Sequence, residues 1–196
     1  MMAFVGTLAF NFGVVLPLLV ERTLHGDELA YSMVYAAMSI GSLVGALFVA
    51  RRPVGDLGWL TSTALMFAVA IAVFSTAPSL AVAYPLAVLV GITSIVFMTA
   101  TTSIVQLHAS PEMRGRVLAV HAMVFLGSTP IGGPILGAIC DRWGPRTGLV
   151  VGAAATLAAA GYGAIRVRHR RAAIRCRHDD ASSGLHEPGG SGLGRG

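Results

Sequence analysis

Six long apolar stretches, separated by short polar segments, organise the first 167 residues of the chain. A helix that crosses the hydrocarbon core of a bilayer needs about 20 consecutive apolar residues, and each stretch reaches that length. The first five contain no Asp, Glu or Arg. The pattern therefore predicts an all-α integral membrane protein with six spanning helices, over residues 1–20, 29–50, 57–76, 80–107, 117–140 and 147–167.

The distribution of arginine predicts how these helices are oriented. The connecting segments are short, so consecutive helices are expected to be antiparallel neighbours. Cytoplasmic loops carry an excess of Lys and Arg. With both termini in the cytoplasm, the inner side carries Arg51, Arg52, Arg114, Arg116 and the seven arginines after position 165, and the outer side carries Arg22, Arg142 and Arg146. We expect a multi-pass protein of the plasma or inner membrane with cytoplasmic N- and C-termini.

Composition excludes several other classes of protein. Hydrophobic residues make up 55 % of the chain and charged residues 12 %, about half the charged share of a soluble domain. The net charge of +5 does not indicate a nucleic-acid partner, because half of the arginines lie after residue 165. No catalytic motif, metal-ligand spacing or cofactor motif is present, so we expect no enzyme activity, cofactor or metal. Residues 168–196, basic and then rich in Gly and Ser, are predicted to form a disordered cytoplasmic tail.

Five polar side chains within the spans are candidates for a substrate pathway. Asn11 lies midway along the first span, where an amide must find a partner or a cavity. Thr99, Thr102 and Gln106 share one helix face at spacings of three and four; alternatively, the hydroxyls bond back to carbonyls in the preceding turn. His121 titrates near neutral pH in its unperturbed state and is a candidate for ion coupling or a simple packing residue.

The fifth span carries two prolines and a pair of glycines. Pro130 and Pro134 each remove a backbone donor, so the helix must bend or open there. Gly133 and Gly137 form a G-x-x-x-G face, which lets helices approach closely in lipid. The segment is either a flexible gate or a fixed kink packed against a neighbour, and the sequence favours neither interpretation.

The order of polar and plain spans predicts an internal repeat. The third and sixth spans are almost uniformly Ala, Leu, Val and Gly, as expected of lipid-facing helices, whereas the other four carry polar or small-residue features. The second span also has a packing face, at Gly41 and Gly45. Two featured helices followed by a plain one, twice, is the pattern of two inverted three-helix repeats in secondary transporters.

Four passages resemble the C-terminal half of a major facilitator superfamily transporter, in the drug and siderophore exporter branch that includes enterobactin exporters and macrolide efflux proteins. Residues 10–19 look like the seventh helix of that branch and residues 45–52 like the end of the eighth. Residues 110–118 resemble the turn into the eleventh helix, and residues 127–137 resemble that helix itself. The similarity extends over residues 1–167.

The resemblance implies a rocker-switch fold in which the first, second, fourth and fifth spans face a central cavity. It implies proton-linked efflux of small amphiphilic molecules, such as drugs or siderophores. Family members have about twelve spans, so we expect this chain to need a complementary six-helix half, or a second copy of itself. The alternative is a six-span protein without transport activity, either a remnant or an interaction partner.

Overall fold

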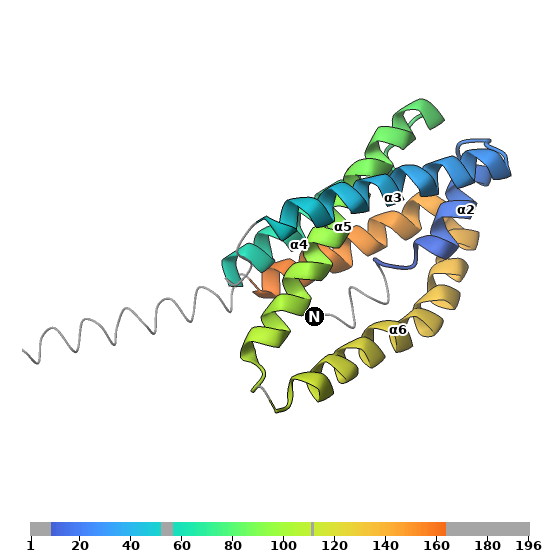
Figure 1. Ribbon diagram of the computed structural model, residues 1–196. Coiled ribbons are helices and arrows are strands. Elements are labelled where there is room, and N and C mark those ends of the chain that lie inside the picture. The colour runs from blue at the N-terminus through green and yellow to red at the C-terminus, as the bar shows by residue number, and fades with distance from the viewer. Residues whose placement is uncertain (1–8, 52–56, 111, 164–196) are drawn as a thin grey trace, which may run out of the picture.

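The computed structural model describes residues 9–51, 57–110 and 112–163, and in these ranges it contains helices and no strands (Figure 1). A further helix, without a label in Figure 1, covers residues 145–163. The labelled helices are α2 (Phe12–Arg22), α3 (Glu28–Ala50), α4 (Leu57–Ser75), α5 (Leu80–His108) and α6 (Arg114–Trp143).

Four of the described helices are long and apolar enough to cross a membrane, and they are α3, α4, α5 and α6. They confirm the second to fifth predicted spans as long apolar helices. The helix α2 has only 11 residues, or about 17 Å at 1.5 Å per residue. The helix over residues 145–163 is not among the four. The first and sixth spans therefore stay predictions.

The expected uninterrupted helix over residues 1–20 is wrong at residues 9–11, which are not helical. Asn11 lies just before α2, with φ −85° and ψ 43°. Its backbone carbonyl accepts hydrogen bonds from the amides of Val14 and Val15, at 3.1 and 3.2 Å. Asn11 is thus the N-cap of α2, without a capping hydrogen bond from its side chain, and the residue that we predicted to be mid-span precedes a helix instead.

The fifth span is longer than predicted, because α6 begins at Arg114 and ends at Trp143. Arg114 and Arg116, expected in a loop, therefore lie in the first turn of the helix. Its 30 residues correspond to about 45 Å, against a hydrocarbon core of about 30 Å. The charged ends of α6 can thus project into the polar headgroup regions, and the predicted location of both arginines at the membrane surface is retained.

The closest packing of backbones is between α3 and α5. A Cβ atom placed at Gly41 would overlap the backbone carbonyl of Val88, and one at Gly91 would overlap that of Met38. At Gly45 the same atom would lie 2.7 Å from the carbonyl oxygen of Ile92. Both glycines therefore lie where the backbones of α3 and α5 approach most closely, and a packing role for them stays a prediction. Contacts of 41 with 88 and of 45 with 92 make the two helices parallel.

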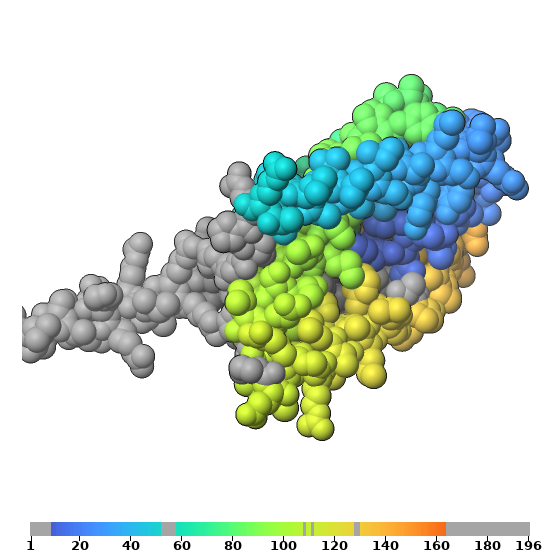
Figure 2. Space-filling model, viewed as in Figure 1, coloured from blue at the N-terminus to red at the C-terminus, as the bar shows by residue number. Residues whose placement is uncertain are grey.

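Most residues of the core come from α2, α4, α5 and the helix over residues 145–163, while α3 adds Ala30 and Val34 and α6 adds Leu136 and Cys140. The most apolar windows of α4 and α5 are each 44 % buried, compared with 22 % in α3 and 19 % in α6. Figure 2 shows one face of the molecule on which α3 and α6 form two edges, with α5 beside them and α2 set back. Little of α4 or of residues 145–163 reaches this face. The predicted tail, over residues 168–196, and Arg52 lie outside the described residues.

Candidate functional site

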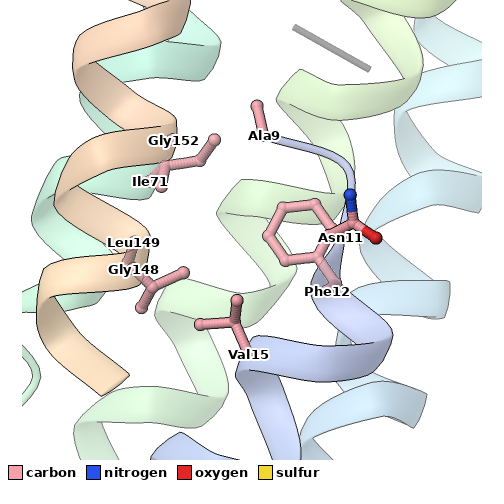
Figure 3. Close-up of a pocket in the computed structure, with 8 residues that line it drawn as sticks. All are labelled: Ala9, Asn11, Phe12, Val15, Ile71, Gly148, Leu149 and Gly152. Carbon is pink, nitrogen blue, oxygen red and sulfur yellow. The ribbon is translucent and has the colours of Figure 1, made fainter. Parts of the chain in front are cut away.

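The predicted pathway residue Asn11 lies at a small cavity between three helices. The Asn11 residue is 4 % exposed. The cavity has a volume of about 10 Å³ and is lined by residues of α2, Ile71 of α4 and residues of the last helix, as Figure 3 shows. The Phe12 ring and Val15 point across the gap toward Gly148 and Leu149. A space of this size holds about one water, so the cavity that the described residues form at Asn11 is too small for a substrate.

Five phenylalanine rings surround this start of α2. Phe10 contacts Phe67 of α4 at a centroid distance of 5.1 Å and Phe125 of α6 at 5.2 Å. Phe67 in turn stacks on Phe97 of α5 at 5.8 Å and contacts Phe12 at 6.4 Å. Such aromatic pairs add to the energy of apolar burial. The cluster holds the broken end of the first span against three other helices, and the sequence analysis missed it.

The hydroxyl groups of α5 bond back to their own helix. Thr102 Oγ1 donates to the Met98 carbonyl oxygen at 2.9 Å, and Thr101 does the same to Phe97 at 2.9 Å. Of the two interpretations of this run, internal bonding is confirmed for Thr102. Thr99 is partly buried, and Gln106 is exposed near the end of the helix. The structure therefore shows no polar pathway formed by these side chains together.

His121 differs from the other candidates, because its ring nitrogen Nε2 is buried and has no hydrogen-bond partner among the described residues. The side chain as a whole is partly exposed. A buried polar atom without a partner is costly unless another molecule or conformation supplies one. His121 is thus a candidate residue for whose buried nitrogen the described residues supply no hydrogen-bond partner.

The second half of α6 packs against α2. Cβ atoms placed at Gly133 and Gly137 would lie 3.6 and 3.9 Å from the side chain of Val14, which is ordinary van der Waals contact. The helix contains Pro130 and Pro134, and Figure 1 shows it as a curved helix and not a straight rod. The two glycines therefore lie near Val14 of α2. Whether the bend is a gate or a fixed kink remains a prediction.

Arginines link helices at both ends of the described bundle. Arg22 Nη1, at the end of α2, pairs with Asp141 of α6 at 2.8 Å. Arg146 donates to the carbonyl of Ala77, after α4, at 2.9 Å. At the other end of α6, Arg114 Nε donates to the carbonyl of Gln106 at 3.1 Å. The sequence placed Arg22 and Arg146 on one side of the membrane but did not identify their partners.

The residues that the structure describes form helices only, and four of these are long and apolar enough to cross a membrane, as a multi-pass membrane protein requires. Residues 2–189 match the family model described as transmembrane secretion effector. Since this match covers most of the chain, the protein belongs to that family, which is of the major facilitator type. No curated protein and no solved structure matches the chain.

Proposed function

We propose that this protein is one six-helix half of a proton-linked exporter of small amphiphilic molecules, such as drugs or siderophores. It would act together with a complementary six-helix half, or with a second copy of itself. The family match supports membrane transport, and the earlier resemblance to drug and siderophore exporters supports the direction and the substrate class. The bundle would lie in the plasma or inner membrane with both termini in the cytoplasm.

The observation that carries the proposal is the uncovered face formed by α3 and α6. These two helices have the least buried apolar windows of the four, 22 % and 19 %. Their exposed large side chains include Leu43, Leu47, Val120, Met123 and Leu126. In lipid an apolar face need not be covered, but a rocker-switch transporter places its substrate between two such faces. The face therefore suits one wall of a central cavity.

Coupling to protons would require groups from the other half. In the four long apolar helices the acidic residues are confined to the end turns, at Glu28 and Asp141. His121 is the titratable side chain in α6 whose buried nitrogen lacks a partner among the described residues. Proton-driven export needs a group that changes charge inside the membrane. We infer that carboxylates of the complementary half act with His121 in this role.

Reconstitution in liposomes tests the proposal. The purified chain would be inserted alone, and together with a six-helix N-terminal half from the same family, under an imposed pH gradient and with a fluorescent lipophilic cation as substrate. We expect accumulation when both halves are present. We expect no uphill movement by the chain alone, because a second copy would pair the faces but add only long helices whose acidic residues lie in end turns. Replacing His121 by Asn should reduce the accumulation, while Leu118→Met, on the same helix and outside the exposed face, serves as a control. Uphill transport by the chain alone would contradict the need for a separate half.

The alternative is a membrane protein without transport activity. The small size of the cavity at Asn11 and the internal hydrogen bond of Thr102 favour it, since neither residue lines a substrate path within this chain. If the two halves form a stable complex in detergent and still move no substrate, the alternative is supported.

A further inference from the structure

An open apolar groove follows α4 where this helix packs against α3 and α5. It consists of two adjoining hollows of about 490 and 320 Å³, which share the side chains of Met66 and Thr93. The walls of the larger hollow include Val44 and Phe48 of α3 and Ile92 and Val96 of α5. Almost all of the lining is aliphatic or aromatic, so the groove suits a hydrocarbon chain.

The groove is long enough for an acyl chain that spans one leaflet of a bilayer. Its lining residues on α4 run from Trp59 in the larger hollow to Val73 in the smaller one. At 1.5 Å per residue these positions are about 21 Å apart, whereas one leaflet contributes about half of the ~30 Å hydrocarbon core. A single acyl chain that enters at the Trp59 end can therefore lie along the groove to the middle of the membrane.

The Trp59 end of the groove carries an arginine. Val44, Phe48 and Arg51 follow one another at spacings of four and three residues, so they share a face of α3. Arg51 is exposed and caps the C-terminus of that helix, and the end of α3 and the start of α4 lie at the same end of the molecule (Figure 1). Arg51 therefore follows two groove residues on one face of α3, and we expect its permanent positive charge at the depth of lipid headgroups.

A second polar group at this end has an unmet hydrogen bond. The indole Nε1 of Trp59 is buried and has no partner among the described residues, although tryptophan N–H groups normally find one. Because the Trp59 side chain is only partly buried, rotation of its ring can turn the N–H toward the groove. Tryptophan is enriched at the membrane interface, where the ester oxygens of phospholipids are acceptors.

We propose that this groove is a binding site for one anionic phospholipid. One acyl chain fills the apolar groove, the headgroup phosphate pairs with Arg51, and an ester oxygen accepts a hydrogen bond from Trp59. An anionic lipid is favoured over a neutral one because its net charge complements the arginine. The proposal requires only that the bundle spans a membrane and does not depend on transport activity.

Native mass spectrometry of the full chain, released from detergent, tests the site. Phosphatidylglycerol and phosphatidylcholine with identical acyl chains would be added in competition. We expect retention of one phosphatidylglycerol molecule per chain. The variant Arg51→Gln should weaken this retention about fivefold, the contribution of one basic residue to binding of anionic lipid. The matched control is Arg142→Gln, an exposed arginine at the opposite end of the bundle, which should change nothing.

Two further variants distinguish the contacts of the lipid's acyl chain from those of its headgroup region. Trp59→Phe keeps the ring but removes the donor, and should weaken retention of both lipids. Val69→Trp fills the smaller hollow and should displace the acyl chain. Equal retention of the two lipids, or equal effects of Arg51→Gln and Arg142→Gln, would overturn the proposal. So would a dimer that excludes lipid, since a second copy would then occupy the groove. A thermal melt of each variant would establish that the bundle is folded.

Discussion

At the scale of single residues, the glycines show that one sequence motif serves two different kinds of contact. Gly41 and Gly45 have the same G-x-x-x-G spacing as Gly133 and Gly137. At Gly41, however, the neighbouring backbone leaves no space for a Cβ atom, whereas at Gly137 the nearest side-chain atom is 3.9 Å from that position. The first pair therefore determines how closely two helices approach, and the second pair only lies at a contact.

This difference predicts that substitution by Ala lowers the stability of the bundle at Gly41 but not at Gly137. Gly41→Ala should destabilise the bundle by about 1–3 kcal/mol, the usual cost of overpacking, because α3 and α5 must move apart. Gly137→Ala should leave the stability nearly unchanged, since a methyl group there fits within ordinary contact distance. Thermal unfolding in one detergent would measure both. If Gly137→Ala proved as damaging as Gly41→Ala, α2 and α6 would have to pack more closely than the structure shows.

Gly91, on α5, supplies an independent check on the close contact between α3 and α5. A Cβ atom there would overlap the Met38 carbonyl, and Ser42 Oγ donates to the Gly91 carbonyl at 3.3 Å. Gly91→Ala should therefore match Gly41→Ala in its effect. The double variant should cost less than the sum of the two, because one separation of the helices relieves both overlaps.

At the scale of elements, the ion pair between Arg22 and Asp141 links the end of α2 to the end of α6. The two side chains are 50 % and 62 % exposed. In water such pairs contribute about 0.2–1 kcal/mol. A double-mutant cycle with Arg22→Ala and Asp141→Ala should give a coupling energy in this range, and it should fall as salt is added. Arg142→Ala in place of Asp141→Ala is the control and should show no coupling to Arg22.

The sequence predicted the long apolar helices well, because about 20 apolar residues leave few alternatives to a spanning helix. It failed at Asn11, where the apolar stretch continues but the backbone is not helical. Hydrophobicity does not detect this break, because the residues on both sides of Asn11 are apolar. The sequence also left open how the hydroxyls of α5 bond. In the structure, Thr102 Oγ1 donates to a carbonyl of its own helix.

The tertiary contacts of the candidate site could not be predicted from spacing alone. Spacing shows which residues share a helix face, but not which helix lies opposite. The phenylalanine cluster needs Phe10, Phe67, Phe97 and Phe125 from four separate segments, and no local pattern brings these together. The lack of a partner for His121 Nε2 likewise depends on helices distant in sequence.

At the scale of the whole molecule, contacts between the ends of helices agree with the predicted alternation of direction. Arg22 pairs with Asp141, and Arg146 donates to Ala77. The polar segments that follow the first, third and fifth predicted spans therefore lie at one end of the bundle. This is the arrangement expected if each helix crosses the membrane once. The contacts do not assign that end to a side of the membrane, and arginine counting predicts that it faces outward.

Labelling with a membrane-impermeant thiol reagent in intact cells would test the predicted orientation. In a Cys176→Ser background, Glu21→Cys, which is exposed at the end of α2, should react from outside. Ser110→Cys, exposed between α5 and α6, should react only after the membrane is permeabilised. The buried native Cys140 serves as an internal control and should not react in either case. The physical reason is the positive-inside rule: Arg114 and Arg116 stand beside Ser110, whereas Arg22 is the only arginine between the first two spans. Labelling of Ser110→Cys in intact cells, with protection of Glu21→Cys, would reverse the orientation and place the basic tail outside.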